Sequence, residues 1–256
     1  MKAAELFDLG GEVALVTGAS SGLGNRFARV LAANGATVIA AARRVEKLDA
    51  LVSDIEQAGG RALAVACDVT DHGQISRAFD QAEDFAGPVT VLVNNAGIAH
   101  GGAAIKLDKE NWSNVLATNL DAVFFTAQEA AQRMVEAEKP GAIVNIASVL
   151  GTHMQKGVSA YAVSKAGVIQ MTKALALEWA RYGIRVNAIA PGWFRTEIND
   201  AYLDSDVGET MMRKNPLRRF GATGDLDGAL LLLASSAGAY MTGSLITIDG
   251  GHTLEV

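Results

Sequence analysis

Residues 17–24, Thr-Gly-Ala-Ser-Ser-Gly-Leu-Gly, decide the fold of this chain. They follow a short apolar run over 13–16 and precede a helix-like pattern over 22–34. Glycine at three of these positions lets the backbone turn tightly, and it lets a ligand and the helix approach the strand closely. Free amide groups at a helix start attract an anion, so the junction suits a pyrophosphate; a glycine-rich turn without a ligand is the alternative.

The rest of the chain alternates short apolar runs with helical patterns. The runs are mostly unalternating Val, Ile, Ala and Leu, which is typical of strands buried on both faces. We predict strands over 12–17, 36–42, 61–66, 89–94, 141–147, 184–190 and 244–248, and helices near 22–34, 45–58, 71–86, 109–137, 160–182 and 224–235. This alternation predicts an α/β, Rossmann-like doubly wound fold: a seven-stranded, mostly parallel sheet with helices on both faces. Ligands bind such sheets beyond the carboxyl ends of the strands, so we expect the site there.

Composition limits what the chain can be. Its 256 residues, 50% of them hydrophobic, are enough for one domain over 1–256 with a large core. The net charge of -6 argues against nucleic acid and anionic membranes as partners. The single cysteine, Cys67, and a start without a secretory pattern lead us to expect a cytoplasmic protein. No apolar run has the roughly 20 residues that a membrane span needs, and no cluster of metal-ligating residues has suitable spacing.

The second predicted strand ends in Ala42, and two arginines follow it. An NAD-selecting fold would place a carboxylate near this point, on the ribose hydroxyls. Arg43 and Arg44 suit a 2′-phosphate instead, because guanidinium groups bind phosphate well; capping of a surface turn is the alternative. After the third strand, Asp68 could accept a hydrogen bond from an adenine amino group, or Asp68 or Thr70 could cap the next helix.

Three residue types with acid–base chemistry follow the fifth strand. Ser148 ends that strand, and Tyr161 and Lys165 lie on the next predicted helix, one turn apart on the same face. A Tyr-x-x-x-Lys pair alone is weak evidence. Its place after the fifth strand, with Ser148 upstream, makes it informative.

With these residues the chain resembles the short-chain dehydrogenase/reductase family, of the single-domain type that includes 3-oxoacyl reductases and ketoreductases. The resemblance covers nearly the whole chain and rests on motifs in family order: TGASSGLG, Asp68, Asn94-Asn95-Ala96-Gly97, Asn119, Ser148, Tyr161-x-x-x-Lys165, Pro191-Gly192 with Thr196, and Asp249-Gly250-Gly251. We interpret the last of these as a structural turn.

The resemblance implies hydride transfer between a nicotinamide and a carbonyl/alcohol pair. Tyr161 is then the general acid or base, and Ser148 binds and orients the substrate oxygen. Lys165 holds the nicotinamide ribose and, with the charge of the nicotinamide, favours the phenolate of Tyr161. Asn119 holds a water that links Lys165 to solvent. We expect NADPH as the preferred cofactor, with NAD(H) open, bound by Gly18, Ser20, Ser21, Gly22, Leu23, Gly24, Arg43, Arg44, Asp68, Val69, Asn95, Ala96, Gly97, Tyr161, Lys165, Pro191, Gly192, Trp193 and Thr196.

The substrate end is less defined. Family substrates lie beneath a variable segment after Pro191-Gly192, here near 193–215, whose apolar residues predict a hydrophobic pocket and a lid. The expected wall residues are Ala99, His100, Val149, Leu150, His153, Met154, Trp193, Phe194, Met211 and Met212; each could equally be ordinary packing.

These residues favour an NADPH-dependent carbonyl reductase acting on a ketone, a β-keto ester or a thioester. The alternatives are an NAD(H)-linked alcohol dehydrogenase working oxidatively, a 3-oxoacyl-carrier-protein or 3-oxoacyl-CoA reductase, and a nucleotide-sensing protein without catalysis. The family also implies a homotetramer built on helices 109–137 and 160–182, whose apolar residues include Trp112, Val115, Leu116, Leu120, Val123, Phe124, Phe125, Val168, Met171, Leu175 and Trp179.

Overall fold

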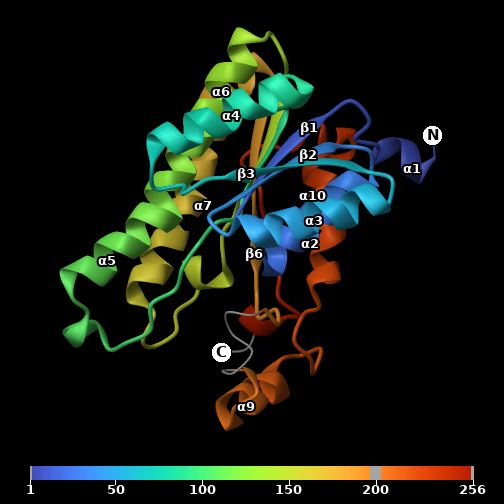
Figure 1. Cartoon of the computed structure of the whole chain (residues 1–256). Helices are drawn as coiled ribbons and strands as arrows, with labels where there is room; N and C mark the ends of the chain where they lie inside the picture. The colour runs from blue at the N-terminus through green and yellow to red at the C-terminus, as the bar shows by residue number, and fades with distance from the viewer. Residues whose placement is uncertain (1, 197–202, 255–256) are drawn as a thin grey trace.

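The computed structural model describes residues 2–196 and 203–254. Its centre is one seven-stranded sheet in the order β3-β2-β1-β4-β5-β6-β7, with every neighbouring pair parallel (Figure 1). The strands are β1 (Val13–Thr17), β2 (Thr37–Ala42), β3 (Arg61–Ala66), β4 (Val91–Asn94), β5 (Gly141–Ile146), β6 (Ile184–Pro191) and β7 (Leu245–Ile248). The predicted doubly wound fold is confirmed, and each predicted strand lies within two residues of its observed bounds.

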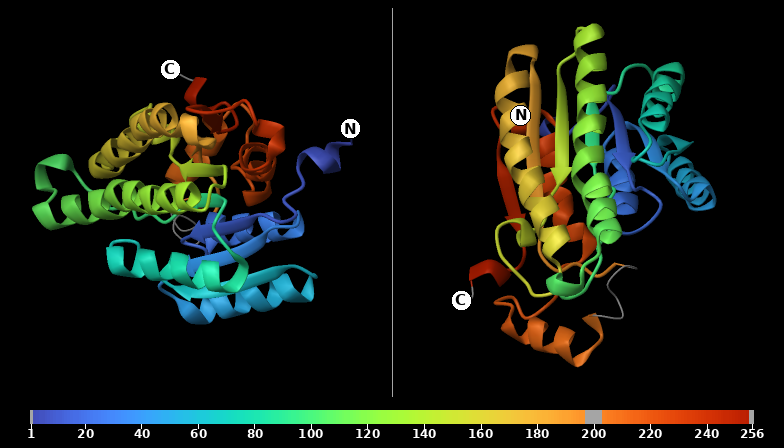
Figure 2. Two further views of the ribbon diagram at one scale, coloured as in Figure 1. Left: turned by 90° about the horizontal axis from the view of Figure 1, so that it is seen from above. Right: turned by 90° about the vertical axis from the view of Figure 1, so that its left-hand side faces the viewer.

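Helices cover both faces of the sheet, as two views of the ribbon show (Figure 2). One layer packs α2 (Gly22–Ala33), α3 (Val45–Gln57) and α10 (Asp227–Ala234) on the sheet; the other packs α4 (His72–Ala86), α6 (Ala122–Glu136) and α7 (Ser159–Trp179). Three further helices are the short α1 (Ala3–Leu6), α5 (Lys109–Leu116) and α9 (Asp206–Lys214). All five residues of β1 and all four of β4 are buried, which explains why the apolar runs do not alternate.

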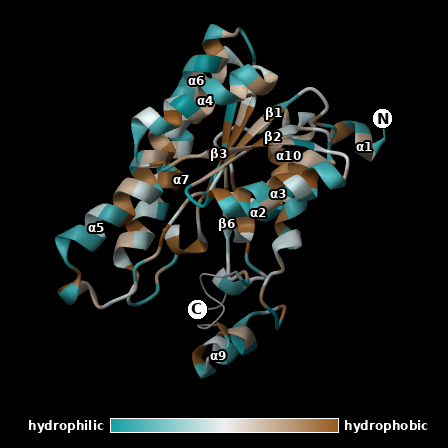
Figure 3. Ribbon diagram, viewed as in Figure 1, coloured by the Kyte–Doolittle hydropathy of each residue, from teal (hydrophilic) through white to brown (hydrophobic). Residues whose placement is uncertain are grey.

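Colouring by hydropathy places brown segments on the strands and teal on the outer surfaces of α4 and α6 (Figure 3). This distribution fits a sheet whose two faces are both covered by helices. None of the helices in the described ranges has the length and apolar character to cross a membrane.

The predicted helix 109–137 is not one regular helix. It consists of α5, a π-helical turn over Ala117–Asp121, and α6. Its residues favour helix throughout, so the periodicity did not reveal the wider turn, which is typical of functional sites. The predicted helix 224–235 is also shorter, because Thr223–Leu226 form a 3₁₀ turn before α10. Helix α9 was not predicted.

The strand order reverses between β1 and β4, and a hydrogen-bond network joins their carboxyl ends. The Thr17 hydroxyl accepts from the backbone N–H of Asn95 (3.0 Å) and of Ala96 (3.1 Å). The Asn95 side-chain amide donates to the Thr17 carbonyl at 2.9 Å. These bonds fix the glycine loop against the end of β4, at the switch point where doubly wound sheets bind ligands.

Candidate active site

A cavity of about 1540 Å³ lies beyond the carboxyl ends of the strands. The glycine loop and the ends of β2 and β3 line one part of it. Another part is lined by residues 148–150, by residues 155–158 and by Tyr161. The sheet topology therefore brings the predicted cofactor residues and the predicted catalytic residues to one cavity.

Ser148 and Tyr161 reach this cavity from two elements. Ser148 follows β5, caps the 3₁₀ turn over Val149–Gly151, and accepts the Leu150 backbone N–H at 3.1 Å. Tyr161 lies in the first turn of α7. Burial raises the pKa of the Tyr161 phenol, and the neighbouring Ser148 hydroxyl opposes that rise. The Ser148 hydroxyl is therefore close enough to Tyr161 to stabilise its phenolate by a hydrogen bond.

Lys165 lies one turn along α7 and is only 4% exposed. Its Nζ donates to the Ile146 carbonyl at 2.7 Å and lies 5.7 Å from the Tyr161 ring centroid. Burial lowers the pKa of this ammonium to about 8. A buried amine with this pKa can exist in either charge state near neutral pH.

The expectation that Lys165, together with the charge of the nicotinamide, favours the phenolate of Tyr161 stays a prediction, because it depends on a bound cofactor. The Tyr161 pKa is raised, because loss of solvent is its largest influence. Lys165, with a pKa of about 8, has already lost its proton at the high pH where this phenol ionises. A lysine in that state offers no positive charge to the phenolate.

Asn119 lies on the π-helical turn and is fully buried. Its side-chain amide accepts from the Ile98 N–H at 2.8 Å and donates to the Ile98 carbonyl at 2.8 Å. It also donates to the Ser164 hydroxyl at 3.3 Å. Asn119 thus joins the loop after β4 to α7, beside the catalytic candidates.

The glycine loop fits a pyrophosphate. A side chain at Gly18 would come within 2.9 Å of the Ala96 Cα, and one at Gly24 would collide with the Gly18 carbonyl. Gly18 and Gly22 adopt φ of 67° and 54°, which favours glycine. Helix α2 begins at Gly22, and its N-cap Ser21 makes no side-chain cap bond. The first amides of α2 are therefore available to an anion.

Two arginines follow β2 at the edge of the cavity. Arg44 donates to the Ser20 hydroxyl (3.1 Å) and to the Ser21 hydroxyl (2.6 Å). The Arg43 side chain is 71% exposed and lies 4.0 Å from Asp68. Two hydrogen bonds from Thr70 lower the pKa of Asp68. The next helix is capped by Asp71, which accepts the Gln74 N–H at 3.1 Å, so neither Asp68 nor Thr70 is the cap.

A comparison with known proteins identifies the family. The protein-family model described as "short chain dehydrogenase" matches residues 12–206 of this chain. This chain belongs to the short-chain dehydrogenase family. It is an NAD(P)-binding oxidoreductase that acts on alcohol and ketone substrates.

Its relatives in this family match from end to end. The gluconate 5-dehydrogenase of Gluconobacter oxydans is 35% identical over 98% of both chains. The 3-oxoacyl-[acyl-carrier-protein] reductase of Thermotoga maritima is 40% identical over 95% of this chain and 98% of its own. The crystal structure of a gluconate 5-dehydrogenase from Burkholderia cenocepacia, in complex with NADP and tartrate, is 36% identical, covers 100% of both chains and superposes with a TM-score of 0.95.

The predicted cofactor residues of this dehydrogenase largely surround the cavity. Those that line it are Gly18, Ser20, Ser21, Gly22, Leu23, Arg43, Arg44, Asp68, Val69, Asn95, Ala96, Gly97, Tyr161, Lys165, Pro191, Gly192, Trp193 and Thr196. Gly24 instead packs on Gly18, inside the loop. Asp249 accepts from the backbone N–H groups of Gly251 and Thr253, both at 2.8 Å, as a structural turn does.

The predicted substrate residues divide into two groups. Ala99, Val149, Leu150, Trp193 and Phe194 line the cavity. His100, His153, Met154, Met211 and Met212 are outside its wall in this structure, and Met154 is 77% exposed. Their contact with a substrate stays a prediction. Tyr202, an apolar residue of the predicted lid, lies outside the described residues.

Several lining residues were not predicted. They include Ile98, Gly101, Gly102, Asn114, Gln155, Lys156, Gly157 and Val158. The signal for the last four was their position between Ser148 and Tyr161. That position alone does not decide, because Met154 of the same stretch is exposed and lies outside the wall. The others follow β4 or lie on α5, and no sequence pattern separates them from ordinary loop and helix residues.

Proposed function

We propose that the chain is an NADPH-dependent carbonyl reductase that interconverts a ketone and a secondary alcohol. The observation that carries the cofactor preference is the pair of arginines after β2. Ala42 stands where an NAD-selecting carboxylate is expected, and Arg43 and Arg44 both line the cavity. Asp68 is the only carboxylate among the described lining residues, and it lies opposite Arg43. A 2′-phosphate placed there would meet two guanidinium groups.

The proton chemistry belongs to Tyr161. The bound nicotinamide would supply the hydride to the carbonyl carbon. The Tyr161 hydroxyl then donates its proton to the carbonyl oxygen as negative charge develops there, and the Ser148 hydroxyl donates a hydrogen bond to the same oxygen. The raised pKa of Tyr161 keeps this proton in place until it is needed. In the oxidative direction, Tyr161 accepts the proton from the alcohol.

Lys165 would return the proton to Tyr161. Its pKa of about 8 lets the ammonium lose and regain a proton at working pH. Asn119 lies next to it: a side chain on Gly97 would come 3.3 Å from Asn119 Oδ1 and 3.8 Å from Lys165 Nζ. Exchange with solvent through a water at Asn119 is part of this proposal.

The test is oxidation of NADPH and of NADH by a ketone panel of β-keto esters, an acetoacetyl thioester, aryl ketones, cyclic ketones and keto sugars. Turnover with NADPH is expected to fall by about 10² or more in Tyr161→Phe. Arg43→Ala should raise the Kd of NADPH and leave that of NADH unchanged. Arg181→Ala, which removes an exposed arginine outside the cavity wall, is the control. Equal loss of both nucleotides in Arg43→Ala would refute the 2′-phosphate assignment.

Three other functions could use the same site. An NAD(H)-linked enzyme working oxidatively would turn over NADH faster in this assay. A 3-oxoacyl reductase would prefer the thioester, and one relative carries that name. A nucleotide-sensing protein would bind a cofactor and turn over nothing, but the complete set of Ser148, Tyr161, Lys165 and Asn119 argues against it.

The segment near 193–215 is proposed to cover the substrate.

We also propose a homotetramer. Four apolar residues expected at its interface, Val115, Val123, Val168 and Leu175, are buried within the single chain, so they are core. The outer surface of α7 offers other candidates: Leu177 is 83% exposed and Val163 is 46% exposed. Light scattering tests the assembly, and a monomeric mass at working concentration would reject it.

A further inference from the structure

Lys156 is a cation that the proposed mechanism does not use. It lies in the stretch between Ser148 and Tyr161 and lines the cavity. Its side chain is exposed, and within residues 2–196 and 203–254 its ammonium makes neither an ion pair nor a hydrogen bond. An ammonium carries three donors and no acceptor, so it complements an anion or an acceptor on whatever occupies the cavity.

The other cations of the cavity wall have partners. Arg43 faces Asp68, Arg44 donates to Ser20, and Lys165 donates to the Ile146 carbonyl. Among the described residues that line the cavity, Asp68 is the one carboxylate, and it lies beside the predicted cofactor residue Arg43. The Ser148–Tyr161 side therefore carries positive charge that no wall carboxylate neutralises.

The backbone around Lys156 is held in place. The Gly102 N–H donates to the Gly157 carbonyl at 2.8 Å, which ties this stretch to the loop after β4. Gly157 has a φ of 84°, a conformation that favours glycine. Helix α7 begins directly after Val158, and the positive end of its dipole adds to the charge of Lys156.

The charge of the whole chain makes this local cation more significant. With a net charge of -6, the protein as a whole repels small anions. An anionic substrate would therefore need a local positive group at the mouth of the site. A neutral ketone would need none.

We infer that Lys156 binds a carboxylate of the substrate, which makes the substrate class a keto acid and its hydroxy acid. The inference rests on the proposed function and narrows it. Lys156 acts on binding and specificity, while Tyr161 and Ser148 act on the reacting oxygen. The apolar residues Val149, Leu150 and Val158 would then pack on the carbon chain between the two polar ends.

The test compares 3-, 4- and 5-oxo acids with their methyl esters, in which a neutral ester group replaces the carboxylate. The wild-type enzyme should prefer the best acid over its ester in kcat/KM by about tenfold, equivalent to about 1.4 kcal/mol. Lys156→Gln should remove that preference through the KM of the acid and leave the ester within about twofold. Added salt should raise the KM of the acid in the wild type more than in the variant.

Lys139→Gln is the matched control, because it makes the same charge change at an exposed lysine outside the cavity wall. It should behave as the wild type. An acid-to-ester ratio unchanged by Lys156→Gln, or a wild type that prefers the esters, would overturn the inference and leave the carbonyl reductase intact.

A second readout needs no turnover. Tartrate added to the enzyme with saturating NADP should raise the Tm of the wild type and of Lys139→Gln more than that of Lys156→Gln. An equal rise in all three would count against the carboxylate site. Failure of every ketone with both nucleotides would refute the proposed function instead, and the two failures are thus distinguishable.

Discussion

The side chain of Lys165 is bonded to the backbone of Ile146, with 2.7 Å between Nζ and the carbonyl oxygen. This contact joins α7 to the last residue of β5, two residues before Ser148. It holds the amine near Tyr161, at a position on the cavity wall where Lys165 is only 4% exposed. The cost of burying a charge there explains why the pKa of Lys165 falls from 10.5 to about 8.

This shift predicts how stability depends on pH. Between pH 8 and 10.5, Lys165 is protonated in the unfolded chain and mostly neutral in the folded one. The unfolded state then binds more protons, so the free energy of unfolding rises with pH across this window, by up to about 1.4 kcal/mol per unit of pKa difference. The contribution is complete above 10.5 and is lost as the pH falls toward 8.

The measurement is the Tm of the wild type and of Lys165→Met from pH 7 to 10.5. The difference between them should be constant below pH 8 and should then move in favour of the wild type. Parallel curves across the whole range would show that the amine of Lys165 keeps an ordinary pKa. Lys173→Met, at an exposed position of the same helix, serves as the control.

A substitution at Gly24 should weaken cofactor binding through a change in packing. A Cβ at this position would meet the Gly18 carbonyl and the Asn95 amide, so Gly24→Ala must move the glycine loop or the start of α2. We expect NADPH affinity to fall at least tenfold, because the pyrophosphate cradle is displaced. Gly228→Ala, on α10 with open space around it, should keep that affinity and gain a few tenths of a kcal/mol in stability. Equal NADPH affinity in the two variants would contradict the packing role of Gly24.

The sequence predicted the sheet, and most of the predicted site residues line one cavity, for physical reasons. Buried parallel strands have a strong apolar signal, and the site lies where those strands end. Gly18, Asp68, Asn95, Ser148 and Pro191 each follow or end a predicted strand, so an error of one or two residues in a strand changed nothing.

The features that the sequence did not predict also share a cause, because each depends on the folded structure. The π-helical turn at Asn119 depends on wider backbone hydrogen bonds, such as that from the Ala122 N–H to the Ala117 carbonyl, which leave no mark in the spacing of apolar residues. The raised pKa of Tyr161 depends on burial, which no motif encodes. Lys156 looks like any loop lysine until the chain is folded and the cavity has a wall.

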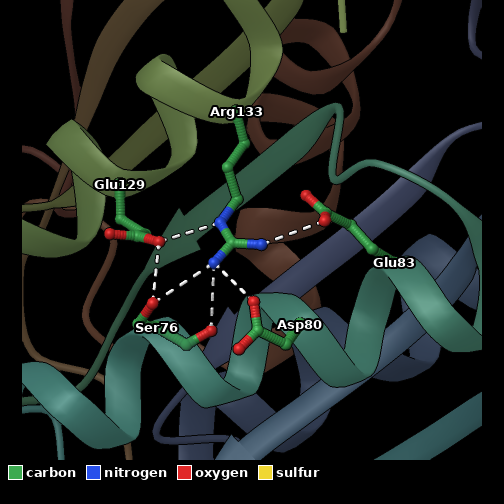
Figure 4. Close-up of polar contacts among 5 residues, drawn as sticks. All are labelled: Ser76, Asp80, Glu83, Glu129 and Arg133. Atoms are coloured by element: carbon green, nitrogen blue, oxygen red, sulfur yellow. Dashed lines mark hydrogen bonds and ion pairs between the residues drawn. The ribbon is translucent and has the colours of Figure 1, made fainter. Parts of the chain in front are cut away.

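Away from the site, one arginine joins two helices. Arg133 of α6 reaches three carboxylates: Asp80 at 2.7 Å, Glu83 at 3.0 Å and Glu129 at 2.8 Å (Figure 4). It also donates to the carbonyl and the hydroxyl of Ser76 on α4, both at 3.3 Å. The side chain is 14% exposed. Burial lowers the pKa of Arg133, but the hydrogen bonds to its carboxylate partners outweigh burial and raise that pKa above its usual value.

Replacing this arginine should destabilise the protein without changing its chemistry. Arg133→Met keeps most of the side-chain volume but leaves three carboxylates facing one another, so we expect a loss of about 1–3 kcal/mol in the free energy of unfolding. Added salt should restore part of the loss, because it screens the repulsion among the acids. Denaturant titration at low and high salt measures both effects, and the KM for NADPH should stay at the wild-type value. A loss that does not depend on salt would mean that Arg133 acts through packing on Phe79, whose ring centroid lies 5.6 Å from the guanidinium carbon, and not through its charge.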